Sequence, residues 1–205
     1  MTSHVINYTR PVSRWQPDAR ERLERAALEL FAEQGFAATT VPEITARAGL
    51  TTRTFFRHFA DKREVLFSGE EEVPGLVTQM MADAPAALDP VTLIVEGLKT
   101  IAETRFEGRR EELREKRQIV RTDESLRERN LRKLAALRDA IHTGFVARGV
   151  APLPATLLAE ISVTLLNVSL NEWLDQTADR PLFDIVLDTL ESLQTTVADF
   201  PARHA

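Results

Sequence analysis

Cysteine is absent from this chain of 205 residues, and histidine is scarce. The first absence excludes disulfide bonds, thiolate metal sites and cysteine nucleophiles. The four histidines, at positions 4, 58, 142 and 204, have no ligand partners at metal-binding spacing, so we expect no metal site and no cofactor. No convergent acid–base or nucleophile set is visible either, and this argues against an enzyme.

Long apolar runs are also missing. Stretches such as LIVEGL and ISVTLL fall far short of the about 20 residues that a membrane span needs. The N-terminal sequence MTSHVINYTRPVSRWQPDAR lacks the apolar core of a secretory signal. We therefore expect a cytoplasmic protein that makes no contact with a membrane.

Residues 39–63, TTVPEITARAGLTTRTFFRHFADKR, carry the most informative pattern in the chain. Thr40 followed by Glu43 fits a capping box that starts a short helix from Val41 to Ala48. Gly49 stands where a left-handed residue would end that helix. Thr51 then caps a second short helix through about His58. Two helices joined by a tight glycine turn are typical of the helix-turn-helix, whose second helix enters the major groove of DNA.

The side chains on the second helix suit this role. Hydroxyl and guanidinium groups can bind phosphates and base edges, and they recur in or beside the helix: Thr51, Thr52, Arg53, Thr54 and Arg57. An ordinary solvated helix face is the alternative explanation. Asp61 and Glu64 predict the cap of a further helix, which would lead away from Lys62 and carry a kink or break at Pro74-Gly75.

The formal net charge of −5 is unevenly distributed. Residues 1–67 hold ten Lys and Arg against eight Asp and Glu, which gives +2, whereas residues 68–205 hold sixteen against twenty-three, which gives −7. Within residues 39–63 the balance is five basic to two acidic residues, or +3. Because phosphate attraction is local and screened over about 8–10 Å, an acidic second domain does not prevent DNA binding.

The remaining apolar spacing predicts helices throughout, so the expected fold class is all-α. A first helix should run from Pro17 to about Gln34. Its apolar side chains should form a small core with those of the next two helices, and Phe36 should fill that core. Residues 1–16 read as a flexible arm in which Arg10 and Arg14 either reach a minor groove or have no role.

In residues 68–205, capping residues, glycines and prolines mark where helices begin and end. Asp89-Pro90 opens a helix to about Phe106, and Gly108 separates it from the charged stretch RREELREKRQIV. We expect the charge run that begins there, RREELREKRQIVRTDESLRERNLRK, to be a solvated helical face, and a surface for DNA or an acidic partner is the alternative. Thr122 or Asp123 caps a long helix that reaches about Arg148. Two strongly apolar helices follow, one containing ATLLAEISVTLLNVSLNEWL and the last containing LFDIVLDTLESLQTTV.

These last two helices carry more apolar surface than a solvated exterior needs. Since large exposed apolar patches mark interaction sites and a helix-turn-helix needs a twofold partner to bind a palindrome, we expect a homodimer interface there. Its predicted residues are Leu158, Ile161, Leu165, Val168, Phe183, Val186, Leu187, Leu190, Leu193 and Val197. An ordinary intramolecular core is the alternative.

The segment from ARERLERAALELFAEQGFAATTV through FFRHFADKREVLF closely resembles the DNA-binding domain of the TetR (tetracycline-repressor) family of bacterial transcriptional regulators. The resemblance covers about a third of the chain and implies domains over residues 17–67 and 68–205. It points to Thr52, Arg53 and Phe56 as base contacts, and to Thr39, Thr40, His58 and Lys62 as backbone contacts. Phe55-Phe56 replaces the family's usual aromatic or Leu followed by Tyr, so one hydroxyl contact to phosphate is missing.

The resemblance also implies a small-molecule effector held among the middle helices, and a dimer formed by the last two helices through a four-helix bundle. The candidate wall residues of the pocket are Phe106, His142, Phe145 and Trp173, although side chains of this kind are more often plain core. Asn171, with Asn167 and Ser169, contacts either the pocket or a dimer partner by hydrogen bonds. The expected function is a homodimeric repressor that an effector releases from a palindromic double-stranded DNA operator. The alternatives are an activator or effector-independent regulator, or a protein-interaction adaptor without DNA binding.

Overall fold

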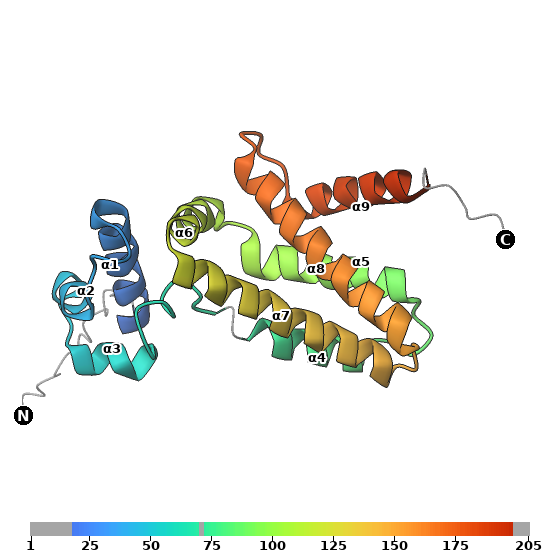
Figure 1. Cartoon of the computed structure of the whole chain (residues 1–205), viewed down its shortest axis with the longest axis horizontal. Coiled ribbons are helices and arrows are strands. Elements are labelled where there is room, and N and C mark those ends of the chain that lie inside the picture. The colour runs from blue at the N-terminus through green and yellow to red at the C-terminus, as the bar shows by residue number, and fades with distance from the viewer. Residues whose placement is uncertain (1–17, 70–71, 199–205) are drawn as a thin grey trace, which may run out of the picture. The chain divides into compact units, whose positions relative to one another are not determined.

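The computed structural model describes residues 18–69 and 72–198, and all regular secondary structure in these ranges is helical (Figure 1). The all-α prediction is confirmed. The described residues fall into two compact units that separate between Val65 and Leu66, and we call them the head and the body. The predicted arm, with Arg10 and Arg14, lies outside the described residues.

The head contains three helices: α1 (Ala19–Gln34), α2 (Val41–Ala48) and α3 (Thr52–His58). The capping box at the start of α2 is present, because Thr40 Oγ1 accepts from the Glu43 backbone N–H and Glu43 accepts from the Thr40 backbone N–H (2.8 Å). Gly49 ends α2 with φ 63°, in the left-handed region that glycine adopts without steric cost. The predicted bounds of α2 and α3 are confirmed.

A small apolar core holds these short helices together. Helices of seven or eight residues are too short to be stable alone, so they depend on this packing. Phe55 on α3 is fully buried and Phe36 is 7% exposed, with its ring 5.1 Å from that of Phe31. Ile44, Ala48 and Phe59 are buried as predicted.

The chain after the head corrects the predicted fourth helix. Residues 62–69 form successive turns, in which the Asp61 carboxylate accepts from the backbone N–H groups of Arg63 and Glu64. The next helix, α4 (Val73–Asp83), begins only at Val73. Pro74 therefore lies in its first turn, where a missing N–H costs nothing, and it produces no kink.

The body continues with α5 (Pro90–Ile101), the π-helix η1 (Ala102–Phe106), α6 (Arg110–Thr122), α7 (Glu124–Ala147), α8 (Pro152–Asp175) and α9 (Leu182–Ala198). Asp89 and Asp123 cap α5 and α7 through their carboxylates, as expected. The π-helical turn was not predicted. Within the body, α7 packs against α4, α6 and α8, and α8 also packs against α9.

Helix α8 differs from the expectation drawn from short apolar runs. Within the described ranges it is the one helix long and apolar enough to cross a membrane by length and composition, with a mean hydropathy of 1.5 over 18 residues. Part of it forms the body core through Ala155, Ala159, Val163 and Leu166. Core helices of helical proteins pass the same test, so this finding alone is weak support for a membrane segment.

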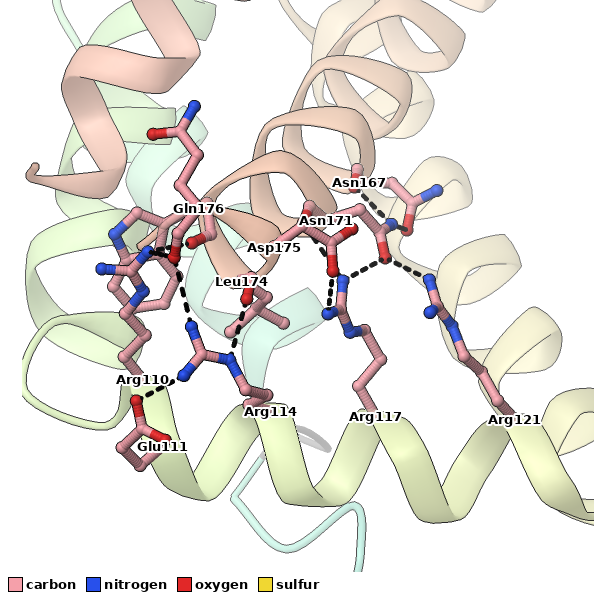
Figure 2. A network of polar contacts seen from close by, with 11 residues as sticks. Arg110, Glu111, Arg114, Arg117, Arg121, Asn167, Asn171, Leu174, Asp175 and Gln176 are labelled. Atoms are coloured by element: carbon pink, nitrogen blue, oxygen red, sulfur yellow. Dashed lines mark hydrogen bonds and ion pairs between the residues drawn. The ribbon is translucent and has the colours of Figure 1, made fainter. Parts of the chain in front are cut away.

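The charged stretch on α6 is not simply a solvated face. Figure 2 shows four arginines of α6 directed at the C-terminal end of α8. Arg110 donates to the carbonyl oxygens of Trp173 (2.6 Å) and Ala178 (2.8 Å), and Arg114 donates to that of Leu174 (2.9 Å). The carbonyls of Trp173 and Leu174 lie in the last turn of α8 and have no partner within it, so the arginines satisfy them, while Ala178 belongs to the loop that follows. The prediction of a solvated face is wrong for this side of α6.

A second helix end is satisfied in the same way. The guanidinium of Arg148, just after α7, donates to the carbonyls of Met81 (3.0 Å), Ala84 (2.9 Å) and Pro85 (2.5 Å) at the end of α4. Neither α4 nor α8 has a basic residue in its own last turn. The cation that complements each helix C-terminus therefore comes from a different helix.

Candidate nucleic-acid interface

Helix α3 presents two different faces. Phe55 points into the head, where its ring lies 5.4 Å from that of Phe59. Arg53, Phe56 and Arg57 are exposed, and the Phe56 side chain is 59% exposed. The Phe56 ring meets the buried Phe55 ring edge-on at 5.4 Å, but most of its surface remains exposed between the two arginines, which leaves this face available for a partner.

The hydroxyl residues around α3 have separate tasks. Thr51 caps the helix, since its Oγ1 accepts from the Thr54 backbone N–H (3.2 Å) and lies 3.0 Å from Thr54 Oγ1. Thr52 is exposed, while Thr40 is held by the capping box. His58 is half-buried. All of these predicted contacts therefore lie in or next to α3, except Thr40, which precedes α2.

The turn between α2 and α3 is fixed from α1. Arg22 Nη2 donates to the Ala48 carbonyl (2.5 Å) and, at 3.4 Å, to the Gly49 carbonyl. A Cβ atom at Gly49 would lie 3.1 Å from the same nitrogen, and the positive φ would strain any other residue. The angle between α2 and α3 thus depends on both the glycine and the arginine.

Lys62 occupies a position that the sequence did not reveal. Its ammonium donates to the carbonyls of Phe36 (2.7 Å) and Thr39 (2.7 Å), and it lies 4.4 Å from the centre of the Phe36 ring. It therefore holds the loop between α1 and α2 in place. The ammonium does not lie at a helix N-terminus, as we had expected, because turns follow it.

Thr39 is a clear correction. Its side chain is 1% exposed, and its hydroxyl donates to the Gly35 carbonyl at 2.9 Å. A buried hydroxyl that is already bonded cannot reach a phosphate from this conformation. Thr39 stabilises the loop before α2, and we remove it from the set of DNA-contacting side chains.

Two of the five cations in residues 39–63 are already paired with carboxylates. Arg47 forms ion pairs with Glu33 (2.7 Å) and Glu29 (3.4 Å), and its hydrogen bond lowers the pKa of the Glu33 carboxyl. Arg63 pairs with Asp61. Among the described residues, Arg53 and Arg57 have no carboxylate partner. The basic surface available to a ligand is therefore narrower than the count of five cations indicates, and it is centred on α3.

Two neighbouring cavities lie between helices of the body, where a single pocket was predicted, and a third hollow of about 600 Å³, beyond the end of α8, is lined in part by Trp173. We call the first, of about 460 Å³, the apolar cavity, and the second, of about 390 Å³, the cationic cavity. Phe145 lines the apolar cavity, whereas Phe106 and Asn171 line the cationic cavity. Trp173 is buried and His142 is half-buried, and neither lines these two cavities. The grouping of all five side chains in one pocket is therefore wrong.

Trp173 has a structural role instead. Its indole N–H donates to the Arg180 carbonyl (2.9 Å), and the Arg110 guanidinium lies 5.2 Å from its ring centre. It thus joins the end of α8 to the loop before α9 and to α6. Over the same described ranges, no group of three or more His, Asp or Glu side chains could hold a metal ion.

The predicted dimer residues also separate into three groups. Leu165 and Val186 are 2% and 0% exposed and belong to the body core, so their assignment to an interface is wrong. Leu158, Phe183, Leu190 and Leu193 are half-buried and pack against that core. The four other predicted residues are exposed: Ile161, Val168, Leu187 and Val197. Because α8 is apolar around most of its circumference, its sequence alone could not distinguish the core face from the outer face.

A residue missed by the prediction extends the exposed group. Leu157 is 54% exposed and lies one turn before Ile161 on α8. Ile161, Thr164 and Val168 continue the same face at helical spacing. We call Leu157, Ile161, Val168, Leu187 and Val197 the outer apolar face of α8 and α9.

A capped helix, a left-handed glycine turn and a second helix with an exposed polar face define a helix-turn-helix domain, which is here followed by an all-helical body. The sequence pattern of the bacterial regulatory proteins of the tetR family matches residues 24–68. The curated relative TcmR of Streptomyces glaucescens, an HTH-type transcriptional regulator, is 39% identical over 72 residues. That similarity spans 35% of this chain and 32% of TcmR.

Solved structures extend the similarity to the fold of the body. NalD, the secondary repressor of the MexAB-OprM multidrug efflux pump in Pseudomonas aeruginosa, has a TM-score of 0.60 at 20% identity, over 86% of this chain and 95% of NalD. The FadR repressor of Thermus thermophilus, solved with lauroyl-CoA, has a TM-score of 0.50 at 25% identity, over 91% of this chain and 97% of FadR. Residues 24–68 therefore carry the DNA-binding domain that is typical of the tetR family, and the relatives that share it are named as transcriptional regulators.

The contacts of Lys62 lead to a test of its structural role. Lys62→Met should lower the free energy of unfolding of the head by about 1–3 kcal/mol, because two buried carbonyls lose a charged donor. Arg53→Met is the matched control and should change stability by less than about 0.5 kcal/mol, since Arg53 is exposed and has no carboxylate partner. Thermal unfolding followed by circular dichroism measures both. Equal stability of the two variants would refute the structural role of Lys62.

Proposed function

We propose that this protein is a sequence-specific, cytoplasmic DNA-binding regulator, which acts as a homodimeric repressor and is released from a palindromic operator by a small-molecule effector. The observation that carries the proposal is the exposed face of α3. Arg53, Phe56 and Arg57 point away from the core, and the two arginines have no carboxylate partner among the described residues. A helix that exposes three large side chains on one face is suited to binding a ligand there.

Docking of α3 in the major groove assigns roles to its side chains. Arg53, near the start of the helix, can bind a guanine edge through two hydrogen bonds, while Phe56 can contact a thymine methyl group. Thr52 lies beside Arg53 and can reach a base edge or a phosphate. The backbone contacts then fall to the residues around the helix: Thr40, Thr51, Thr54, Arg57, His58 and Lys62. The ammonium of Lys62 would act mainly through the loop that it holds.

Dimerisation would use the outer apolar face. Its side chains are 37–56% exposed, although they are Leu, Ile and Val. Exposed apolar surface along two adjacent helices is stabilised when a second copy covers it. A twofold dimer would also present two copies of α3 to successive major grooves about 34–36 Å apart.

Release by an effector is supported by the two cavities and by one relative. Cavities of about 300–1,000 Å³ between helices are typical of small-molecule sites, and both cavities fall in this range. FadR of Thermus thermophilus was solved with lauroyl-CoA and is named a repressor. An effector would favour a conformer with wrongly spaced heads, to the extent of its differential affinity for the two conformers.

An activator, or a regulator without an effector, would share the same DNA-binding face and differ only in the response of its target genes. A protein-interaction adaptor would bind no DNA at all. Arg53 and Arg57 are exposed and have no carboxylate partner among the described residues, as DNA binding requires, and this argues against an adaptor that binds no DNA. A gel-shift assay with genomic DNA fragments separates the adaptor from the regulators.

Base recognition by Arg53 can be tested on an operator selected from random DNA. Arg53→Ala should weaken binding by about 1–3 kcal/mol and relax the sequence preference at one base position of each half-site, because one side chain that reads a base edge is lost. Arg132→Ala, an exposed arginine on α7, is the matched control and should bind normally. Wild-type affinity and preference for Arg53→Ala, measured by fluorescence anisotropy, would rule out the docking of α3 described above.

The dimer face can be tested without disturbing the core. Ile161→Glu and Leu187→Glu place a charge on positions that are exposed within one chain but would be desolvated in a dimer. Light scattering should show folded monomers that have lost operator affinity. Leu131→Glu, at a 66% exposed leucine on α7, should remain dimeric. If both outer-face variants stay dimeric and bind DNA, the interface lies elsewhere.

A further inference from the structure

The cationic cavity has a chemical character that specifies its ligand. We propose that it binds an organic anion with an apolar body, and that this class of molecule is the effector. The effector role rests on the proposed function, whereas the binding of the anion does not. No carboxylate lines the cavity among the described residues, yet five cationic side chains do: Lys116, Arg117, Arg121, Arg127 and Lys133.

These cations differ in how fully they are already neutralised. Lys116 is 6% exposed and pairs with Glu112 (2.8 Å). Burial opposes ionisation of Glu112, but the hydrogen bonds from Arg109 and Lys116 outweigh it and lower the pKa of its carboxyl to about 2. Arg117 forms an ion pair with Asp175. The deeper cations therefore have carboxylate partners outside the cavity lining.

The exposed cations Arg121 and Arg127 form no ion pair with a carboxylate among the described residues. The Arg121 guanidinium donates to Asn171 Oδ1 at 3.5 Å (Figure 2). The hydrogen bond from Arg117 lowers the pKa of the Asp175 carboxyl, and the nearby charge of Arg121 adds to this effect. Arg127 donates to the backbone carbonyl of Arg121 (3.0 Å), which leaves its charge without a counter-ion. Both side chains line the cavity and are exposed to solvent. An anion at this position would gain charge-assisted hydrogen bonds from two guanidinium groups.

The remainder of the lining is apolar and would bury the body of such an anion. It includes Phe67, Phe106, Leu113, Leu134, Leu170 and Leu174. Inorganic anions would gain nothing from these walls, whereas each buried methylene of an organic ligand contributes to affinity. The combination of exposed cations and apolar walls selects an amphipathic anion over either a simple salt or a neutral hydrocarbon.

The apolar cavity provides an internal comparison. Its charged lining residues are Asp83 and Glu96, and no cation lines it among the described residues. It therefore disfavours anions. Four side chains form a partition, since they line both cavities: Val73, Ile101, Leu137 and Leu166. Two adjacent cavities in one body thus differ in the sign of the charge that they accept.

The cationic cavity also lies where a ligand could influence α8. Arg117 donates to the Asn171 carbonyl (3.1 Å) and pairs with Asp175, both near the end of that helix (Figure 2). An anion in the cavity would compete with Asp175 for Arg117. Because α8 carries part of the outer apolar face, this competition links the ligand to the proposed dimer interface.

The binding test uses the full chain and isothermal titration calorimetry with four probes below their micelle-forming concentrations. These are decanoate, decanol, decyltrimethylammonium and inorganic phosphate. Decanoate should bind at least about ten-fold more tightly than each of the others, because only it offers both an anion and an apolar chain. Its affinity should fall as salt is added, since the two guanidinium groups are solvent-exposed.

Variants locate the site. Arg121→Gln and Arg127→Gln should each weaken decanoate binding about ten-fold, while Arg132→Gln, an exposed arginine outside the cavity, should have no effect. Leu170→Trp should block the cationic cavity. Gly97→Leu should fill the apolar cavity instead and leave decanoate affinity unchanged, because a Cβ at Gly97 meets only Met80 Cε, at 4.0 Å. Circular dichroism melts verify that each variant is folded.

Several results would overturn the proposal. Among the probes, they are the absence of decanoate binding, or binding of decanol, the ammonium probe or phosphate with an affinity equal to or higher than that of decanoate. Among the variants, the contradicting result is a decanoate affinity that falls with Gly97→Leu but not with the arginine substitutions. Operator release is measured separately by fluorescence anisotropy. Decanoate binding without release would contradict the effector role and leave the anion site intact. Release by a neutral or cationic compound alone would support the regulator and refute the anion site.

Discussion

Unsatisfied carbonyl groups at helix ends are the constraint on which both units of this protein depend. The last carbonyls of a helix have no partner within it, and here cationic side chains from distant parts of the chain supply the donors. Arg22 holds the end of α2, and Arg148 holds the end of α4. Arg110 and its neighbours on α6 hold the end of α8, and Lys62 holds the loop before α2. Each contact fixes where the next helix begins.

The same contacts explain how an acidic protein can present local positive charge. Near the helix-turn-helix, Arg47 and Arg63 are paired with carboxylates, and the donors of Lys62 and Arg22 are used on backbone carbonyls. Arg53 and Arg57 remain on the exposed face of α3, where we propose DNA binding. Arg121 and Arg127 remain at the cationic cavity, where we propose binding of an anion. The positions of the unpaired cations are therefore more informative about function than the net charge of −5.

Features of the head that depend on neighbours in sequence could be predicted. The capping box of Thr40 and Glu43 and the left-handed Gly49 act within four residues, so their pattern was sufficient. Contacts across the fold could not be predicted, because nothing local to Lys62 indicates that it binds carbonyls more than twenty residues away. The prediction that Leu165 lies in a dimer interface failed for a related reason. Helix α8 is apolar on most sides, so its sequence does not show which side faces the core. The cavities could not be predicted either, because their walls come from many helices.

The central claim is that two copies of α3, held by a dimer of bodies, read a twofold DNA site. Hydroxyl-radical footprinting of the full chain on a selected operator tests it most directly, combined with light scattering of the complex to count chains. We expect two symmetric protected regions whose centres are about 34–36 Å apart along the duplex, with an even number of chains bound. A single unsymmetrical footprint from one chain, or uniform protection independent of sequence, would contradict it.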